Sequence, residues 1–240
     1  MRLDKYLHDL GYGSRRDIER LIKRQQVTVD GVRAKQGAVK VAADSEVAID
    51  GQPLVYAPTV WLMLNKPAGV ITAAKDKEQE TVMDLLPERF ARMQVMPVGR
   101  LDKDTTGLLL LTNDGALAHR LLSPKQHVEK VYEVFYEETL AADAAAQCAA
   151  GIDLGDFTSA PAELEVVAPG HCFLRLREGK FHQVKRMMHE LGGVVTALHR
   201  VSFGGLTLDE ALAPGAWRLL TDDEVSLLSA QGLQKGGDQR

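Results

Sequence analysis

The sequence has no long hydrophobic run, and this absence sets its broad class. No stretch approaches the roughly 18 consecutive apolar residues of a membrane-spanning helix. The first residues, Met1 to Lys5, lack the apolar core of a secretory signal. With 240 residues, of which 45% are hydrophobic, the chain is long enough to bury substantial cores. We therefore expect a cytoplasmic globular protein with no membrane partner.

Cysteine is almost absent, and several common catalytic motifs are missing. The two cysteines, Cys148 and Cys172, have no CxxC partner and no histidine at a ligand spacing, so we expect buried thiols rather than a disulfide or a zinc site. The sequence has no GxxxxGKS or GxxxxGKT phosphate loop, no GxGxxG after a strand, no HExxH and no GxSxG. Nucleotide hydrolysis, dinucleotide redox chemistry and serine hydrolysis therefore lack their usual signals.

The net charge of -4 hides an uneven distribution. Residues 1 to 40 hold ten of the 29 Lys and Arg but only five of the 33 Asp and Glu, a local charge of +5 against -9 for the rest of the chain. A basic segment of this kind can bind the phosphates of a nucleic acid, although a solvated helix face has a similar composition. The cations expected on its outer faces are Arg15, Arg16, Arg20, Lys23 and Arg24.

Two regions with different patterns follow one another along the chain. In the first, leucines at helical spacing and a Ser14/Asp17 capping box predict two short helices, and Asp-Gly turns at 30–31 and 50–51 predict a small β element. Residues 49–60 contain two prolines and are expected to be a linker. Residues 231–240 are polar and Gly-rich and are expected to be a disordered tail.

Residues 61–230 are predicted to alternate between strands and helices. Apolar or alternating runs predict strands over 61–64, 108–111, 130–136, 163–167 and 172–176. Helical spacing predicts helices over 116–122, 140–150, 181–191 and 221–229.

The segment richest in chemical groups is residues 98–107, VGRLDKDTTG, which leads into four leucines. A charged loop with a glycine near each end, placed before an apolar strand, holds polar groups on a rigid support. This makes the loop the first candidate site, although a surface turn would show the same pattern. Asp102 and Asp104 could form a general acid and base pair, but residues two apart in a loop have no fixed separation.

The helix predicted over 181–191 has one apolar and one cationic face. The cationic face carries His182, Lys185, Arg186 and His189. It could be an ordinary solvated face, but the preceding turn at 178–180 can bring backbone close to a phosphate. Metal binding by the histidines is disfavoured because no acidic or thiol companion accompanies them.

Together these segments resemble a known family over nearly the whole chain. Residues 1 to about 48 look like an S4 RNA-binding domain. The sequences LMLNKP at 62–67, GRLD at 99–102 and DTTGL at 104–108 are similar to the signature motifs of S4-linked bacterial pseudouridine synthases. The resemblance implies an α+β fold, with a small S4-type (αL) domain at 1–48 and a catalytic domain at 61–230 built on a mixed, mainly antiparallel β-sheet with flanking helices.

The resemblance also implies an activity, the isomerisation of a uridine to pseudouridine, which needs no cofactor and no metal. It implies that Asp102 is the catalytic aspartate, that Tyr132 lies against the target base and that Lys185 is the basic partner of the aspartate. Whether Asp102 attacks the ribose, adds to uracil or removes a sugar proton stays open. The remaining cations expected to bind RNA are Arg100, beside a flipped base, and His182 and Arg186.

The segment EGKFHQVKRM at 178–187 is similar to family members that act on small-subunit (16S) ribosomal RNA. We therefore expect 16S RNA as the partner, within a small-subunit assembly intermediate, and a monomeric protein. Two alternatives remain, the same chemistry on 23S RNA and a non-catalytic S4-type assembly factor. A hydrolase built on paired carboxylates is disfavoured because no second acid stands at a defined spacing.

Overall fold

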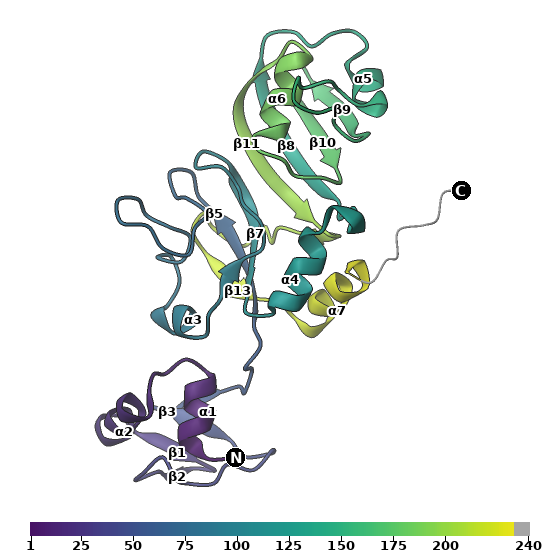
Figure 1. Cartoon of the computed structure of the whole chain (residues 1–240). Helices are drawn as coiled ribbons and strands as arrows, with labels where there is room; N and C mark the ends of the chain where they lie inside the picture. Colours follow the sequence, from purple (N-terminus) through teal and green to yellow (C-terminus); the bar gives the residue numbers. More distant parts are fainter. Residues whose placement is uncertain (233–240) are drawn as a thin grey trace. The chain divides into compact units, whose positions relative to one another are not determined.

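The computed structural model describes residues 1–232, and these residues form two compact units (Figure 1). The first unit consists of Met1–Val60 with Leu86–Met96, and the second of Trp61–Leu85 with the described residues from Pro97 on. Neither unit contains, within residues 1–232, a helix with the length and hydrophobicity needed to span a bilayer. The predicted boundaries at 48 and 60 stay a prediction.

The first unit packs short helices on a small antiparallel sheet. Its helices are α1 (Leu3–Asp9), α2 (Arg15–Arg24) and α3 (Glu88–Arg92), and its sheet has the order β2-β1-β3-β4. The strands are β1 (Val27–Val29), β2 (Val32–Arg33), β3 (Val47–Ile49) and β4 (Gln52–Leu54). The predicted capping box begins α2, because the Asp17 amide donates to Ser14 Oγ at 3.3 Å and the Ser14 amide donates to the Asp17 carboxylate at 3.1 Å.

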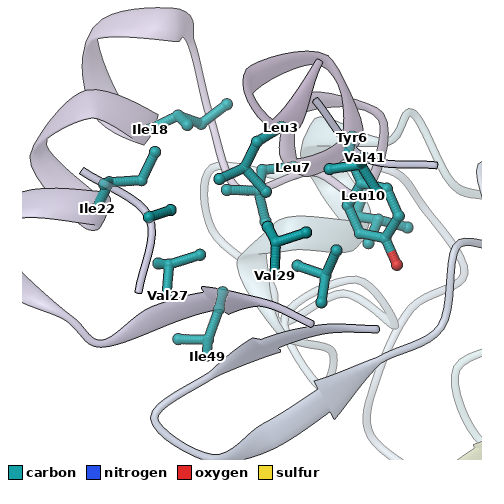
Figure 2. Packing of buried hydrophobic residues seen from close by; sticks show 12 residues of the cluster. Leu3, Tyr6, Leu7, Leu10, Ile18, Ile22, Val27, Val29, Val41 and Ile49 are labelled. Carbon is teal, nitrogen blue, oxygen red and sulfur yellow. The ribbon is translucent and has the colours of Figure 1, made fainter. Parts of the chain in front are cut away.

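The first unit has a hydrophobic core of its own (Figure 2). Leucines of α1 and isoleucines of α2 point toward the side chains of β1 and β3. Leu3, Leu7, Ile18 and Val27 are completely buried. Because burying one such side chain contributes about 1.5–3 kcal/mol, this cluster is a main source of the unit's stability.

The stretch expected as a linker, 49–60, is in part a strand. The Asp50–Gly51 turn folds the chain back, and Gln52–Leu54 pairs with β3 in an antiparallel register. Pro53 lies opposite Ala48 on the outermost strand of the sheet, where a residue without an amide proton is tolerated. The two prolines in the sequence therefore gave a misleading signal for this segment.

The second unit is built on a mixed sheet of order β13-β5-β7-β11-β8-β10-β9, with β12 paired to β11. All neighbouring strands in this order are antiparallel except β7 and β11, so the prediction of a mixed, mainly antiparallel sheet is confirmed. The strands are β5 (Trp61–Lys66), β7 (Thr106–Thr112), β8 (Lys130–Glu137), β9 (Glu163–Ala168), β10 (His171–Leu176), β11 (Val194–Phe203), β12 (Leu206–Thr207) and β13 (Trp217–Leu219), with the short β6 (Met96–Pro97) at the boundary of the units.

Helices cover parts of this sheet (Figure 1). They are α4 (Gly115–Leu122), α5 (Ala144–Ala150), α6 (Gln183–Glu190) and α7 (Asp222–Gln231), with a 3-10 turn η1 (Pro124–Gln126) after α4. The four expected helices are present, although α5 begins at Ala144 rather than at residue 140. Of the expected disordered tail at 231–240, Gln231 ends α7, and residues 233–240 lie outside the described residues.

The parallel contact between β7 and β11 is short. His199 lies opposite Thr106 and Arg200 opposite Gly107. Gly107 has a φ of +98°, and a Cβ atom there would lie 2.4 Å from the Arg200 carbonyl oxygen. The glycine is therefore required for β7 and β11 to approach so closely. This seam brings the start of β7 next to β11.

Candidate active site

The loop that carries Asp102 is fixed on both sides of that residue. Before it, the Thr72 hydroxyl donates to the Leu101 carbonyl at 2.8 Å and accepts from the Leu101 amide at 3.1 Å. After it, the Thr105 amide donates to the Asp102 carbonyl at 3.2 Å, and β7 begins at the next residue. The Asp102 side chain is 28% exposed. A reachable carboxylate is thus held on a rigid support.

A buried lysine contacts the same loop from the interior. Lys66, the last residue of β5, is completely buried. Its Nζ donates to the carbonyls of Pro67 at 2.9 Å, Lys103 at 3.2 Å and Thr105 at 2.9 Å. An ammonium has three protons, so these bonds satisfy it completely. Lys66 therefore joins the residues around Asp102 to the core.

Two side chains of the α6 segment, Lys185 and His182, lie beside Asp102. Lys185 Nζ is 3.6 Å from Asp102 Oδ2, and His182 Nε2 is 3.6 Å from Asp102 Oδ1. These are ion-pair distances rather than hydrogen bonds. Lys185 makes its hydrogen bonds to Asp104, at 2.6 and 2.8 Å, and this contact holds the pKa of the Asp104 carboxyl below its usual range. Lys185 therefore bridges both aspartates of the loop.

The turn before α6 determines where His182 and Lys185 lie. Glu178 accepts hydrogen bonds from the Ala160 amide and from the Gln183 side chain, and the Lys180 amide donates to the Gln183 side chain at 2.9 Å. His182 then adopts the left-handed conformation, with a φ of 50°, at the N-cap of α6. This entry to α6 places the His182 and Lys185 side chains beside the Asp102 loop.

The carboxylate borders a small pocket of about 110 Å³ within the second unit. Tyr132 of β8 lines it and is only 8% exposed. The pocket brings together the expected site residues Arg100, Asp102, Tyr132, His182 and Lys185. Apolar side chains complete its wall, among them Leu176, Val184, Leu198 and Phe203. A space of this size with apolar walls suits one flat ring rather than a stretch of RNA.

Two further cations line the pocket that the sequence did not reveal as site residues. Lys130 lies two residues before Tyr132 on β8, and both residues line the pocket. Arg200, on β11, is 2% exposed, and its Nε donates to the Leu108 carbonyl at 2.8 Å. Phe203, opposite Lys130 in the β8–β11 register, packs close to both cations. A charged residue inside an apolar strand was the signal that could have identified Arg200.

The other expected RNA-binding residues are not among those that line this pocket. Arg186 makes an ion pair with Asp156 and donates to the Leu154 carbonyl at 2.6 Å. The five cations of the first unit are exposed on α2, and Arg20 is 3.9 Å from Asp17. They are Arg15, Arg16, Arg20, Lys23 and Arg24. Within residues 1–232, no group of three or more His, Cys, Asp or Glu side chains is arranged to hold a metal ion.

Comparison with known families accounts for both units. The family model for RNA pseudouridylate synthase matches residues 60–190, a range that contains Asp102, Tyr132 and Lys185 but not Arg200. The model for the S4 domain matches residues 1–47. A solved structure described as a crystal structure of pseudouridylate synthase superposes with a TM-score of 0.68 at 35% identity, covering 95% of this chain and 99% of the other.

Curated relatives are similar over almost the whole length. The chain is 43% identical over 231 residues to ribosomal small subunit pseudouridine synthase A of Escherichia coli (strain K12), covering 94% of this chain and 99% of that protein. It is 44% identical over 235 residues to a Bacillus subtilis (strain 168) protein named uncharacterized RNA pseudouridine synthase YtzG, covering 95% and 98%. The family resemblance in the sequence is thereby confirmed, and the chain belongs to the RNA pseudouridylate synthase family, with an S4 domain at residues 1–47.

Proposed function

We propose that this protein converts a uridine of small-subunit (16S) ribosomal RNA into pseudouridine, and that Asp102 is the essential carboxylate. The position of Asp102 carries the proposal, because it borders a pocket that fits one base, beside Tyr132 and 3.6 Å from both the Lys185 ammonium and the His182 imidazole. The small-subunit enzymes among its relatives, similar over nearly their full length, support the choice of 16S RNA.

The chemistry explains why these groups are needed. The bond between ribose C1′ and uracil N1 breaks, the base rotates while it stays bound, and C5 bonds to C1′. No atom is gained or lost overall, so the reaction requires no cofactor. The uridine must first leave its stack, which costs a few kcal/mol and less in a loop than in a helix. Arg100 at the mouth and the basic face of α2 would offset this cost by binding phosphates.

The decisive experiment is the Asp102→Asn variant, assayed by release of tritium from 16S RNA labelled with [5-³H]uridine. We expect activity to fall below detection while RNA binding and the melting temperature stay near wild type, because the side chain keeps its size and loses only its charge. Undiminished tritium release from the variant would refute the role of Asp102.

A second variant tests the cationic partner. Lys185→Met removes the ammonium that lies between Asp102 and Asp104. We expect turnover to fall by roughly 100-fold, the effect of about 3 kcal/mol of lost transition-state stabilisation, with less than a threefold change in RNA affinity. Equal turnover of the variant and the wild type would exclude Lys185 as the partner.

The identity of the substrate is tested by mapping pseudouridine across 16S and 23S RNA from cells that lack the protein. We expect pseudouridine to be missing at one 16S position. Re-expression of the wild type should restore it, and re-expression of Asp102→Asn should not. Loss at a 23S position would select the large-subunit alternative. An unchanged map would instead support a non-catalytic assembly factor. Comparing naked 16S RNA with assembly intermediates as substrates in vitro then tests the expected stage of action.

A further inference from the structure

Two cations lie in the wall of the pocket without a carboxylate partner. Lys130 is 9% exposed, and its Nζ donates to the Val128 carbonyl at 2.8 Å. Arg200 lies opposite Tyr132 on the adjacent strand and donates through Nε to the Leu108 carbonyl. The ion pairs found within residues 1–232 include neither side chain. Buried cations are normally paired, so these two need another explanation.

Unpaired polar atoms concentrate at the same place. Arg200 Nη2 and Thr105 Oγ1 are buried without a hydrogen-bond partner, and both residues line the pocket. In the part of the chain that the structure describes, only Gln126 Oε1 shares this property. A buried polar atom without a partner destabilises a fold, and it is retained where a ligand can supply the missing bond. The pocket is thus built to receive a polar ligand.

The depth of the two cations identifies which part of a nucleotide they contact. Arg100 and Lys180 are exposed side chains at the pocket, where a phosphate backbone stays in solvent. Lys130 and Arg200 lie among apolar side chains instead, with the Phe203 ring centroid 5.4 and 5.3 Å away. Only the part of a nucleotide that enters the hollow can reach them, and that part is the base.

We propose that Lys130 and Arg200 bind the carbonyl oxygens of the uracil and stabilise the negative charge of the base while it is detached from ribose. This proposal rests on the proposed function and adds two base-binding residues to it. When the N1–C1′ bond breaks, its electron pair stays on the base and is spread over N1, O2 and O4. After rotation, C5 bonds to C1′ with that pair, C5 loses its proton and N1 gains one. The two cations act through their charge and transfer no proton.

The electrostatics of Lys130 agree with this role. The pKa of Lys130 is lowered to about 8, chiefly by burial and also by the neighbouring Arg200 guanidinium, while Glu178 opposes the shift. Two neighbouring cations repel each other, and an anionic ligand between them removes that penalty. Preorganised charges in a site that excludes water stabilise a developing anion far more than the same charges in water.

The test uses the full chain and its 16S RNA substrate with Lys130→Gln and Arg200→Gln, which remove charge but keep hydrogen-bonding groups. We expect the single-turnover rate to fall by roughly 100-fold for each variant, with the RNA dissociation constant within threefold of wild type. The melting temperature should not fall, because an unpaired buried charge is lost. Arg200→Lys, which restores a cation, should recover part of the rate.

The matched control is Arg175→Gln. Arg175 alternates along β10 with Leu174 and Leu176, so it lies on the other face of the sheet from the pocket-lining Leu176, and its ion pairs with Glu163 and Glu165 are both 3.8 Å long. Removing a strand arginine there should leave the single-turnover rate unchanged. A loss of rate equal to that of Arg200→Gln would overturn the assignment.

A substrate that lacks one carbonyl oxygen locates the contact. The target uridine is replaced with 4-deoxyuridine, which lacks O4, or with 2-thiouridine, which lacks O2. If Lys130 or Arg200 contacts the missing oxygen, substituting that residue should lower the single-turnover rate on the analogue by less than tenfold, because the contact is already lost. Additive losses with both analogues would overturn base binding.

Other outcomes of the substitutions would assign the two cations to different roles. A loss in RNA affinity alone would assign them to phosphate binding, and a lowered melting temperature with a normal single-turnover rate would make them structural. If the wild type forms no pseudouridine, the proposed function itself has failed.

Discussion

Two lysines are buried in the second unit, and they differ in how their ammonium groups are satisfied. Lys66 donates hydrogen bonds to three backbone carbonyls around the Asp102 loop. Lys130 donates to a single carbonyl, that of Val128. Burial is similar at the two sites, yet only the second leaves hydrogen-bonding capacity unused. A buried lysine therefore indicates a ligand site only when its donors are not already occupied.

The charges that surround the two lysines also differ. Burial lowers the pKa of each lysine to about 8. At Lys66, the carboxylates of Asp104 and Asp102 oppose this effect. At Lys130, the largest neighbouring charge is the Arg200 guanidinium, which adds to it. Burial therefore disfavours both cations, but the neighbouring charges partly offset that cost at Lys66 and increase it at Lys130.

The strongest test of this difference is the stability of two matched variants. Lys66→Met leaves three carbonyls without a donor, so we expect it to lose about 3 kcal/mol or more of unfolding free energy. Lys130→Met leaves one such carbonyl and removes a repelled charge, so we expect a change of less than about 1 kcal/mol. Urea unfolding of both variants measures this. Equal losses would show that the two sites are alike.

Stability against pH gives a second, smaller effect. Because burial lowers both lysine pKa values below 10.5, the folded chain releases protons above pH 8 that the unfolded chain retains, and stability should rise from pH 8 to 9. We expect about 1 kcal/mol from each lysine over this interval. Lys66→Met and Lys130→Met should each lack the part of the rise that comes from the replaced lysine, and the double variant should lack both parts.

An opposing effect is already present between pH 8 and 9 and grows above pH 9, so each lysine variant is compared with the wild type over pH 8 to 9. Burial raises the pKa of Cys148 and of Cys172 to about 11. The unfolded chain then ionises its thiols before the folded chain does, so these two groups lower stability as the pH rises from 9 to 11. A rise in stability that persists in the double lysine variant between pH 8 and 9 would contradict the assignment to these lysines.

The smallest expected effect is a change in the pH at which stability begins to rise, and it depends on the carboxylates near Lys66. Asp104→Asn removes one of the carboxylates that favour the charged form of Lys66, and it leaves the neighbours of Lys130 unchanged. The rise in stability should therefore begin at a lower pH in this variant, with a total change below about 1 kcal/mol. The same shift in an Asp104→Asn, Lys66→Met double variant would trace it to another group.

Most elements of the fold follow from local pattern, and the exceptions have a physical cause. The capping box at Ser14 correctly located the start of α2, and the helix predicted over 221–229 corresponds to α7. Strand β11, ten residues long, was not predicted. Its pairing with β8 shifts register between Val195 and Ala197 and again between Arg200 and Ser202, and such irregularities disrupt the period of two that indicates a strand.

The site was predictable in its parts but not in its arrangement. The sequence singled out the Asp102 loop and the cationic face of α6, and the structure brings them together at 3.6 Å. Lys185 donates its hydrogen bonds to Asp104 rather than to Asp102. The sequence could not predict this, because residues two apart in a loop gain fixed positions only from tertiary contacts. Arg200 escaped notice because it lies on the unpredicted strand β11.

The seam between β7 and β11 has a consequence for how this enzyme meets its substrate. Gly107, five residues after Asp102, lies directly against the backbone of Arg200. Main-chain geometry therefore sets the spacing between the acid and the buried cations before any RNA arrives. A uridine that enters meets charges already in position, and little reorganisation energy remains to be supplied during the reaction.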